Sequence, residues 1–315
     1  MSRLMPNAEE IEFKDKFIER YSQLTDFEKF KQYSLSFLRR SIRVNTLKIT
    51  IPELKKRVEA QDWVLTPIPW CKEGFWVEHK QGRRDIGNLI EHTLGYFYVQ
   101  ESASMIPPLV LDPQPGDVIL DIAASPGSKT SQIAAMMENQ GILIANDYKH
   151  DRMKPLDINL QRIGATNTII TLMHGQRFKD MQFDKILVDA PCSGTGTIAK
   201  SIKTLRIWNP NMVRRLSGTQ KQLIETAFKN LKKGGTLVYS TCTLEPEEDE
   251  AVISHLLDNY PDAKIEEIDL PGLKRSNAVL EFNGTKYNPE VKKCLRIWPQ
   301  DNDTEGFFVA KIKKI

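Results

Sequence analysis

The chain has 315 residues, of which 40% are hydrophobic and 27% are charged, and its formal net charge is +3. This length and composition support a large buried core, which we expect to be divided between two units. The small positive charge permits an RNA partner without establishing one. The first 30 residues are dense in charge and contain no apolar signal segment or membrane span, so we expect a soluble, cytoplasmic protein that contacts no membrane.

The first hundred residues predict a small α+β unit. Apolar residues at helical spacing indicate two amphipathic helices within residues 7–38, the second opened by a capping box from Thr25 to Glu28. We expect a helix over 51–60 and strands over 41–47, 63–68, 74–77 and 96–99. Prolines at 107, 108, 113 and 115 place a boundary near Met105, so the predicted domains are 1–104 and 105–315.

From Met105 onward strands and helices alternate, as in a parallel sheet covered by helices. We expect strands over 118–123, 142–147, 168–172, 185–189 and 236–240, completed by 264–268 and 307–312. The expected helices cover 129–139, 151–164, 212–232 and 247–260, the third closed by Gly234-Gly235. The predicted fold class is therefore α/β, a doubly wound, Rossmann-like sheet with a small N-terminal α+β domain.

A cofactor site is predicted where the first strand of this sheet turns into a helix. The segment Asp121-Ile-Ala-Ala-Ser-Pro-Gly-Ser-Lys-Thr130 contains Gly127, which can adopt the positive φ of a tight turn, and the helix start after it can bind an anion. Asp147 ends the next strand, where an acid commonly bonds ribose hydroxyls. The segment is neither a Walker A loop nor a GxGxxG fingerprint. It predicts an adenosine-type cofactor and leaves nicotinamide and S-adenosylmethionine both open.

The predicted chemistry lies at the ends of two other strands. Asp189-Ala-Pro-Cys192 follows the strand 185–189, and Cys242 ends the apolar run 237–242. Because ligands of open α/β sheets bind at the carboxyl ends of the strands, an acid and two thiols there predict covalent chemistry on an electrophilic carbon. The four cysteines form no CxxC pair, so no zinc or other metal is expected, and Cys71 and Cys294 are expected to be structural.

Basic residues concentrate just after Cys192. Between Lys200 and Lys233 there are nine basic residues and one acid, Glu225. Such a segment predicts contact with RNA phosphates near the mouth of the site. Trp208 within it is expected either to stack on a base or to pack in the core. A second basic cluster, Arg39, Arg40 and Arg43, is either a further RNA contact or a solvated surface.

Four motifs occur in a fixed order: the segment 121–130, Asp189-Ala-Pro-Cys-Ser-Gly, Ser240-Thr-Cys-Thr, and Asp303-Thr-Glu-Gly-Phe-Phe-Val-Ala. Together with the segments 42–48 and 98–105 they resemble the Sun-domain (Fmu, or RsmB/Nop-like) family of RNA cytosine-5 methyltransferases. The resemblance covers nearly the whole chain. Its compact length and two-helix N-terminus are similar to the archaeal tRNA-modifying members.

The resemblance implies S-adenosylmethionine as cofactor. It implies that the cofactor-binding residues are Ala123, Ala124, Ser125, Pro126, Gly127, Ser128, Lys129, Asp147, Arg152, His174 and Asp189. The chain departs from the family's pattern at two of these positions. The family usually has a second glycine where Ser128 stands, and an aspartate that bonds the adenine amine where His174 stands. Because His174 replaces this aspartate, the affinity of the chain for the cofactor is in question.

The catalytic roles are also implied by the resemblance, since the residues alone do not rank the two thiols. Cys242 is the expected nucleophile that adds to C6 of cytosine, and Cys192 is expected to assist product release. Asp189 is expected at the N3 edge of the base, while Lys129 either pairs with the cofactor's carboxylate or lies near the base. The alternative assignment, attack by Cys192, is the one that DNA cytosine-5 methyltransferases use.

The leading interpretation is methylation of cytosine C5 in tRNA. The same chemistry on ribosomal RNA is the first alternative. A nicotinamide-dependent dehydrogenase and a non-catalytic RNA-binding protein are the others, although the first leaves both cysteine motifs unexplained and the second leaves Asp189, Cys192 and Cys242 without a role. RNA is the expected partner, and the sequence indicates no particular protein partner.

Overall fold

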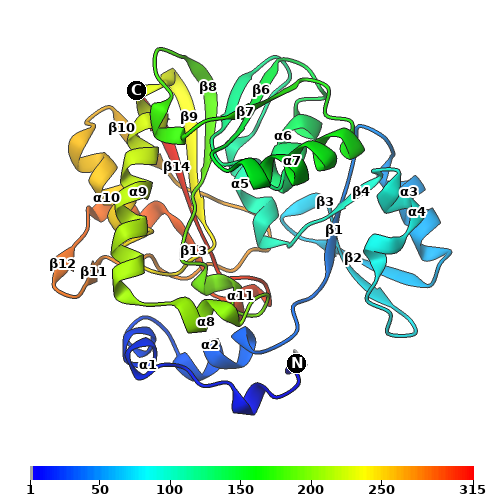
Figure 1. Ribbon diagram of the computed structural model, residues 1–315, viewed down its shortest axis with the longest axis horizontal. Coiled ribbons are helices and arrows are strands. Elements are labelled where there is room, and N and C mark those ends of the chain that lie inside the picture. Colours follow the sequence, from blue (N-terminus) through cyan, green and yellow to red (C-terminus); the bar gives the residue numbers. More distant parts are fainter. Residues whose placement is uncertain (1–2) are drawn as a thin grey trace.

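The chain folds around two β-sheets of unequal size (Figure 1). The computed structural model describes residues 3–315. The smaller sheet has four antiparallel strands, and the larger has eight strands around a parallel centre. This confirms the predicted α/β fold with a small additional α+β region. None of the helices in residues 3–315 is long and apolar enough to span a membrane.

Two N-terminal helices precede the smaller sheet, and they confirm the amphipathic helices predicted within residues 7–38. They are α1 (Asp15–Ser22) and α2 (Phe27–Ser34). Their aromatic side chains pack on Trp208 and Trp298 from the C-terminal half of the chain. Figure 1 accordingly shows them beside α8 (Lys203–Ile207) and α11 (Pro299–Asn302) and away from the smaller sheet.

The capping box predicted at the start of α2 is wrong. Asp26 is the N-cap residue, and its side chain accepts a hydrogen bond from the backbone N–H of Lys29. Thr25 instead accepts a hydrogen bond through Oγ1 from Nε2 of Gln300, at 2.9 Å. A neighbouring aspartate is as good a cap as threonine, so local pattern alone does not distinguish them.

The smaller sheet has the strand order β2-β3-β1-β4. Its strands are β1 (Ser41–Val44), β2 (Trp63–Ile68), β3 (Cys71–His79) and β4 (Phe97–Val99), with α3 (Ile51–Glu59) and α4 (Ile90–Thr93) beside them. The predicted strands and helix of this region are therefore present, with their ends shifted by up to three residues. Thr50 and Glu53 form a capping box at the start of α3.

The larger sheet has the order β10-β14-β9-β8-β5-β6-β7, with β13 paired to β14 at one end. Its strands are β5 (Val118–Asp121), β6 (Ile142–Asp147), β7 (Thr168–Leu172), β8 (Phe183–Asp189), β9 (Leu231–Thr241), β10 (Ala263–Glu266), β13 (Leu295–Ile297) and β14 (Phe307–Lys314). All seven predicted strands are found. β14 runs antiparallel between β9 and β10, which the sequence pattern did not indicate, and β13 was not predicted.

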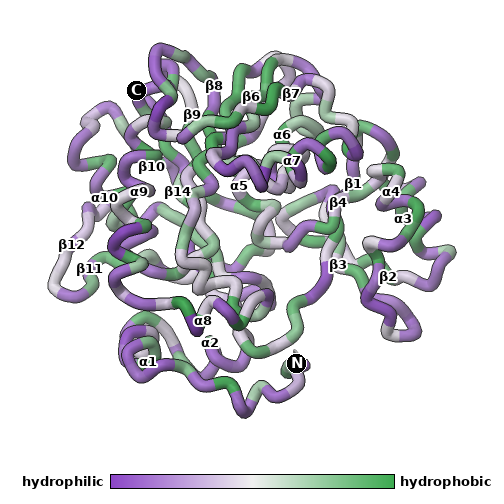
Figure 2. The backbone as a smooth tube through the Cα atoms, viewed as in Figure 1, coloured by the Kyte–Doolittle hydropathy of each residue, from purple (hydrophilic) through white to green (hydrophobic). Residues whose placement is uncertain are grey.

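Helices cover both faces of the larger sheet, as a doubly wound fold requires. On one face α9 (Pro210–Lys229) and α10 (Glu250–Asn259) bury Ile224 and Ile253 against the strands. On the other lie α5 (Ile106–Leu111), α6 (Ser128–Met136) and α7 (His150–Ile163). Figure 2 shows β6 and β7 as hydrophobic stretches of backbone. β6 is largely buried, whereas β7 is the edge strand and exposes Ile169 and Leu172.

The predicted end of the third helix is wrong. The helix ends at Lys229, and the side chain of Asn230 donates hydrogen bonds to the carbonyls of Thr226 and Phe178. β9 already begins at Leu231, so Gly234 and Gly235 lie inside a strand. Gly234 has a φ of +78°, at the point where the register between β8 and β9 shifts. The two glycines therefore form a strand irregularity.

The strand order fixes where a ligand can bind. The chain adds β6 and β7 on one side of β5 and then crosses to add β8 on the other. Such a switch point opens a crevice beyond the carboxyl ends of β5 and β8. The turn after β5 and the Asp189–Cys192 loop after β8 both lie there, and β9 delivers Cys242 beside them.

Candidate active site

The turn between β5 and α6 has the predicted geometry. Gly127 has a φ of +99° and is the N-cap residue of α6, and a Cβ at this position would lie 3.2 Å from Leu156 of α7. A left-handed residue so close to a second helix favours glycine. Ser128 is the first residue of α6 and is helical, so it needs none of the conformational freedom of glycine.

A buried carboxyl group anchors this turn. Oδ2 of Asp121, at the end of β5, accepts a hydrogen bond from the Thr130 hydroxyl at 2.7 Å, and Oδ1 has no hydrogen-bond partner among residues 3–315. Burial raises the pKa of Asp121 to about 7. The Asp121–Thr130 bond ties the end of the strand to the first turn of α6, and so fixes the loop between them.

Beyond this turn lies a cavity of about 530 Å³. Five of the predicted cofactor-binding residues line it: Ala123, Ser125, Arg152, His174 and Asp189. Apolar Ile122 and Leu223 form part of its wall, while Tyr148 lies beside His174 with ring centroids 5.6 Å apart. The volume and the mixture of apolar wall and few polar groups are those of a nucleoside-sized ligand site.

Like Gly127, the predicted cofactor-binding residue Asp147 lines neither this cavity nor the second one described below. It is fully buried, and its carboxylate accepts hydrogen bonds from the backbone N–H groups of Ser125, at 3.3 Å, and Lys149, at 3.1 Å. Arg152 lies 3.5 Å from Oδ2 of Asp147 and also donates to the Ser125 carbonyl. Asp147 therefore supports two residues that line the cavity.

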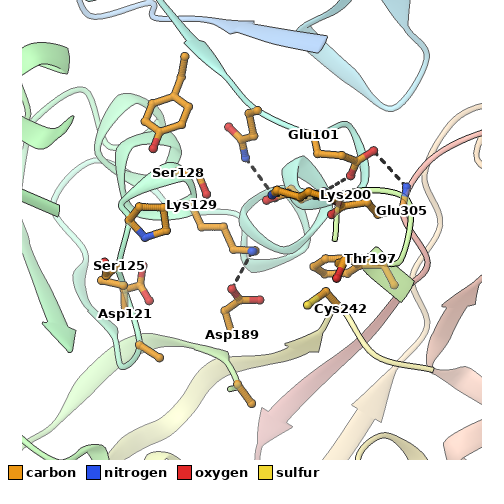
Figure 3. A pocket seen from close by; sticks show the side chains of 18 of the residues that line it. Glu101, Asp121, Ser125, Ser128, Lys129, Asp189, Thr197, Lys200, Cys242 and Glu305 are labelled. Atoms are coloured by element: carbon orange, nitrogen blue, oxygen red, sulfur yellow. Dashed lines mark hydrogen bonds and ion pairs between the residues drawn. The ribbon is translucent and has the colours of Figure 1, made fainter. Parts of the chain in front are cut away.

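Figure 3 shows a second cavity, of about 360 Å³. It shares a wall with the first. Ala123, Ser125, Asp189, Ala190 and Cys242 line both cavities. The predicted residues Ala124, Pro126, Ser128 and Lys129 line only the second, and Cys192 lines only the first. The two chambers thus meet at the acid and one of the two thiols.

An ion pair crosses the second cavity. Nζ of Lys129 lies 2.7 Å from Oδ2 of Asp189, whose Oδ1 accepts a hydrogen bond from Ser240 at 2.8 Å. Burial alone would lower the pKa of Lys129, but the Asp189 carboxylate raises it, and the nearby Cys242 adds to the effect. Lys129 therefore remains an ammonium group beside Cys242 and 5.3 Å from the ring centre of Phe307.

The two predicted catalytic thiols are adjacent. The sulfurs of Cys192 and Cys242 lie 3.2 Å apart, and both residues are free cysteines. The hydrogen bond to Cys242 and then burial raise the pKa of Cys192 well above its ordinary value. Either sulfur can donate in this contact, and the raised pKa of Cys192 favours its protonated form.

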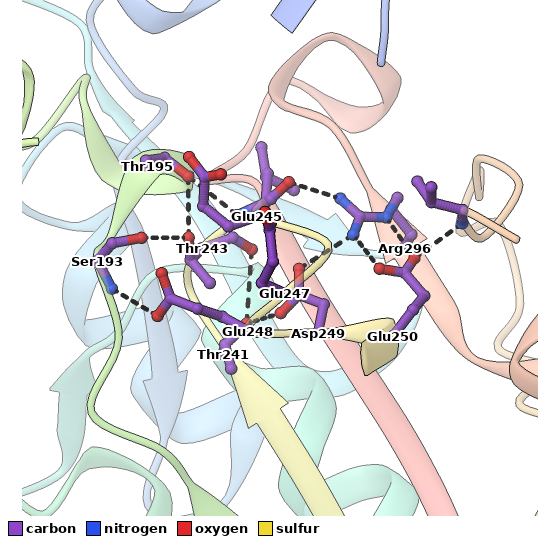
Figure 4. Close-up of polar contacts among 12 residues, drawn as sticks. Ser193, Thr195, Thr241, Thr243, Glu245, Glu247, Glu248, Asp249, Glu250 and Arg296 are labelled. Carbon is purple, nitrogen blue, oxygen red and sulfur yellow. Dashed lines mark hydrogen bonds and ion pairs between the residues drawn. The ribbon is translucent and has the colours of Figure 1, made fainter. Parts of the chain in front are cut away.

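Acidic residues hold the loops that carry these thiols, and sequence reasoning missed them (Figure 4). The backbone N–H of Ser193, next to Cys192, donates to Oε2 of Glu248 at 3.0 Å. The Ser193 hydroxyl is 2.7 Å from that of Thr243, next to Cys242. Burial raises the pKa of Glu248 to about 7. The acidic run 245–250 looks like a solvated surface in sequence, yet its members 245 and 248–250 are buried.

Arg296 neutralises the far end of this acidic run. Its guanidinium, fully buried, lies 3.1 Å from Asp249 and 2.6 Å from Glu250. It also donates to the carbonyl of Leu244, two residues after Cys242. The signal that could have identified this network is the arginine within the apolar strand Leu295–Ile297, because a charge there requires a buried partner.

The predicted basic segment is divided by the fold. Lys200 lines the second cavity and Arg215 lines the first. Lys232, in contrast, pairs with Asp184 at the amino end of β8, the opposite edge of the sheet. Trp208 is 1% exposed and donates to Glu245 at 2.7 Å, so it packs in the core and is not available for stacking on a base.

The predicted cluster Arg39, Arg40 and Arg43 is also divided. Arg43 points into the core, where Nε donates to Gln100 at 2.8 Å, and it is 2% exposed. It is therefore no RNA contact. Arg39 and Arg40 remain at the surface, beside a cavity described below. Within residues 3–315 no three His, Cys, Asp or Glu side chains are grouped so that they could hold a metal ion.

The doubly wound sheet, the inserted antiparallel strand β14 and a nucleoside-sized cavity at the switch point define a methyltransferase fold that uses S-adenosylmethionine. Comparison with protein-family models gives two matches: "16S rRNA methyltransferase RsmB/F" over residues 108–313 and "N-terminal domain of 16S rRNA methyltransferase RsmF" over residues 13–102. The chain belongs to the RsmB/F family of methyltransferases.

Individual relatives agree with this membership. The chain is 50% identical over 302 residues to the tRNA (cytosine(49)-C(5))-methyltransferase of Pyrococcus abyssi, covering 95% of this chain and 96% of that protein. It is 46% identical over 283 residues to ribosomal RNA small subunit methyltransferase F of Vibrio parahaemolyticus, covering 88% of this chain but only 57% of that protein.

Solved structures show the same fold. A methyltransferase homolog protein from Pyrococcus horikoshii superposes with a TM-score of 0.87 and 36% identity over 99% of this chain and all of that one. NSun6 from Pyrococcus horikoshii, determined with SFG, gives a TM-score of 0.82 at 24% identity, covering 96% of this chain and 98% of that one.

Proposed function

We propose that this protein transfers a methyl group from S-adenosylmethionine to C5 of cytosine in tRNA, with Cys242 as the nucleophile. The observation that carries this proposal is the meeting of two cavities at Cys242 and Asp189, with Lys129 and Cys192 on either side. Methyl transfer to a base requires donor and acceptor chambers that open onto one another. Addition to the base requires a thiol at that junction.

The residues of the larger cavity fit the cofactor. Ile122 and Leu223 offer apolar surface to a purine, and the Arg152, His174 and Asp189 side chains offer the few polar contacts that orient a nucleoside. Gly175 belongs to the same wall, where a Cβ would lie 2.6 Å from Leu223. S-adenosylmethionine, when bound there, supplies an electrophilic methyl group.

In the second cavity the chain activates the base. The Cys242 thiolate adds to C6, and the C5–C6 electron pair becomes available at C5 for bonding to the methyl carbon. The addition places negative charge on the N3 side of the ring. We assign this side of the ring to the Lys129 ammonium, which lines the cavity and is held by Asp189, because preorganised charge of this kind stabilises a developing anion.

Release requires the reverse of the addition. The C5 proton leaves to solvent, its electron pair re-forms the C5–C6 double bond, and the S–C6 bond breaks with its electrons returning to sulfur. The Cys192 thiol supports this step because it keeps its proton and lies 3.2 Å from the Cys242 sulfur, to which it can donate. Cys192 thus favours departure of the thiolate.

The similarity to the Pyrococcus abyssi enzyme, over nearly the full length of both chains, supports tRNA as the substrate and cytosine 49 as the first position to examine. Ribosomal RNA is the second candidate, favoured by the family models and by the Vibrio relative. It has weaker support because this chain spans just over half of that protein.

The test compares wild type, Cys192→Ala and Cys242→Ala after incubation with unmodified tRNA transcript and S-adenosylmethionine. A denaturing gel detects a covalent protein–RNA adduct, and transfer of labelled methyl detects turnover. Cys192→Ala should accumulate the adduct because the departing sulfur has lost its donor, and Cys242→Ala should form none. A Cys71→Ala variant controls for thiols outside the site and should behave as wild type.

Accumulation of the adduct only in Cys242→Ala would reverse the two roles. A tRNA transcript in which cytosine 49 is replaced by uracil tests the position. If the protein methylates ribosomal RNA but not tRNA, ribosomal RNA replaces tRNA as the proposed substrate.

A further inference from the structure

A third cavity, of about 690 Å³, lies outside the two chambers of the active site. Its lining is strongly basic, with two acids among its residues, Glu78 and Asp303. The arginines that line it are Arg3, Arg39, Arg40, Arg83 and Arg84. They come from three separate parts of the chain: the N-terminus, the connection from α2 to β1, and the loop after β3. Convergence of arginines from distant segments is the pattern of an anion site.

The arginines differ in how far their charge is already neutralised. Arg83 forms two hydrogen bonds with Asp85, at 3.0 and 2.9 Å, and so is satisfied. Arg39, Arg40 and Arg84 have no carboxylate within 4.0 Å among residues 3–315. Partial burial and the positive charge of Arg84 lower the pKa of Arg40. The Asp85 carboxylate, which Arg83 already binds, opposes this shift without removing it. Arg40 and Arg84 are therefore held close together, and neither forms an ion pair of its own among residues 3–315.

Aromatic rings hold two of these guanidinium groups in place. Arg39 lies over the ring of Trp76 at 3.6 Å from its centre, and Arg84 lies over Phe37 at 4.3 Å. Cation–π contacts of this kind fix a side chain without neutralising its charge. The cavity therefore presents preorganised positive charge, and Phe37 adds an apolar surface between the arginines.

Two short stretches of chain connect this cavity to the second cavity of the active site, which is called the base chamber below because the target base is proposed to bind there. Asp303 lines the arginine cavity and Glu305 lines the base chamber, and two residues span at most about 7 Å. On the other side Arg40 precedes Ser41, whose hydroxyl donates to the carbonyl of Gln100 in the base-chamber wall at 2.5 Å. The walls of the two cavities are thus joined by short stretches of chain on two sides.

We propose that Arg39, Arg40 and Arg84 form a phosphate-binding site for the RNA strand that carries the target cytosine. The site lies next to the base chamber, so it would hold the backbone of the nucleotides flanking the target while that base occupies the chamber. Guanidinium forks suit phosphate oxygens geometrically and electrostatically. This inference rests on the proposed function, since it assumes an RNA substrate.

The test measures binding of labelled, unmodified tRNA transcript by fluorescence anisotropy between 50 and 200 mM salt, with no methyl donor present. The variant is Arg40→Gln/Arg84→Gln, and Arg39 is left in place because it packs on Trp76. The matched control is Lys55→Gln/Lys56→Gln, which removes the same charge from α3, a helix that lines neither cavity. Calorimetric binding of S-adenosylmethionine confirms that each variant is folded.

Loss of two phosphate contacts should weaken tRNA binding roughly 10- to 30-fold at 0.1 M salt and reduce the slope of log Kd against log salt by about 1 to 2. The lysine control should change neither quantity appreciably. Equal effects in both double variants would overturn the proposal, because they would reflect net charge alone. Wild-type affinity in the arginine variant, with tRNA methylation intact, would overturn it while leaving the proposed function standing. If the wild-type protein neither binds nor methylates any RNA, both this inference and the proposed function are wrong.

Discussion

Nζ of Lys129 lies 2.7 Å from Oδ2 of Asp189, and this ion pair joins α6 to the end of β8 across the second cavity. Lys129 lies in the first turn of α6, directly after the turn at Gly127, and Asp189 ends β8 just before the loop that carries Cys192. The pair therefore couples the two halves of the site. It also leaves an ammonium group beside Cys242, the proposed nucleophile.

Replacing Lys129 with glutamine should reduce single-turnover methyl transfer by about 100-fold or more, the usual effect of removing one preorganised charge at a reacting centre. Asp189 keeps its hydrogen bond from Ser240, so the loop should stay in place and the melting temperature should change little. Lys129→Arg keeps the charge but changes its shape, so it should recover only part of the rate. A wild-type rate in Lys129→Gln would assign this lysine a purely structural role.

Removal of Arg296 should destabilise the protein by about 3–5 kcal/mol, because it leaves Asp249 and Glu250 buried without a counter-ion. Chemical denaturation of Arg296→Met measures the loss. The triple variant Arg296→Met/Asp249→Asn/Glu250→Gln removes the unpaired charges as well and should recover most of it. Equal instability of the single and triple variants would show that packing, and not charge, dominates at this position.

The strands of the larger sheet and the residues at their ends could be predicted from sequence because both depend on local pattern. Apolar runs identify β5 and β8, and the residues that follow them must lie at the carboxyl edge of the sheet. Asp189, Cys192 and Cys242 therefore come together as predicted. The distance between the two thiols could not be predicted, since it depends on the loops that Glu248 holds.

The sequence analysis failed mainly in predicting which charged residues are buried. Arg43 lies close to Arg39 and Arg40 in sequence, but it belongs to β1, all four residues of which are buried, whereas Arg39 and Arg40 precede the strand. Arg84 lies more than forty residues away in sequence and shares their cavity. Contacts between distant segments decide which charges remain at the surface, and a single sequence contains no local signal for them.

His174 is a test of cofactor recognition, because it lines the larger cavity at a position where the family usually has an aspartate. If the imidazole accepts a hydrogen bond from the cofactor, His174→Ala should weaken S-adenosylmethionine binding by roughly 2- to 10-fold, the range of one hydrogen bond. His174→Asp should bind at least as tightly as wild type. Isothermal titration calorimetry measures both, with His92→Ala as a control because His92 lines neither chamber. Unchanged affinity in His174→Ala would remove this residue from the cofactor site.

Glu248 predicts a specific dependence of stability on pH. Burial raises its pKa from the ordinary 4.5 to about 7 in the folded protein. Below pH 4.5 the carboxyl is protonated in both the folded and unfolded states. Between pH 4.5 and 7 it stays protonated in the folded protein but ionises in the unfolded chain, so rising pH favours unfolding. The stabilisation is lost across that range, and by pH 8 the loss from this group should reach about 3 kcal/mol.

Glu248→Gln isolates this contribution. Glutamine keeps an oxygen that can accept from the Ser193 N–H and from Gln220, the two donors to Oε2, but it does not ionise. Free energies of unfolding measured from pH 4.5 to 8 should therefore fall more steeply for wild type than for the variant, and the variant should gain on wild type as pH rises. Asp121 and Glu305, also with pKa values of about 7, remain in both proteins and cancel in the comparison. Parallel curves for the two proteins would mean that Glu248 ionises alike in the folded and unfolded states. The link between the acidic run and the Cys192 loop would then rest on hydrogen bonding alone.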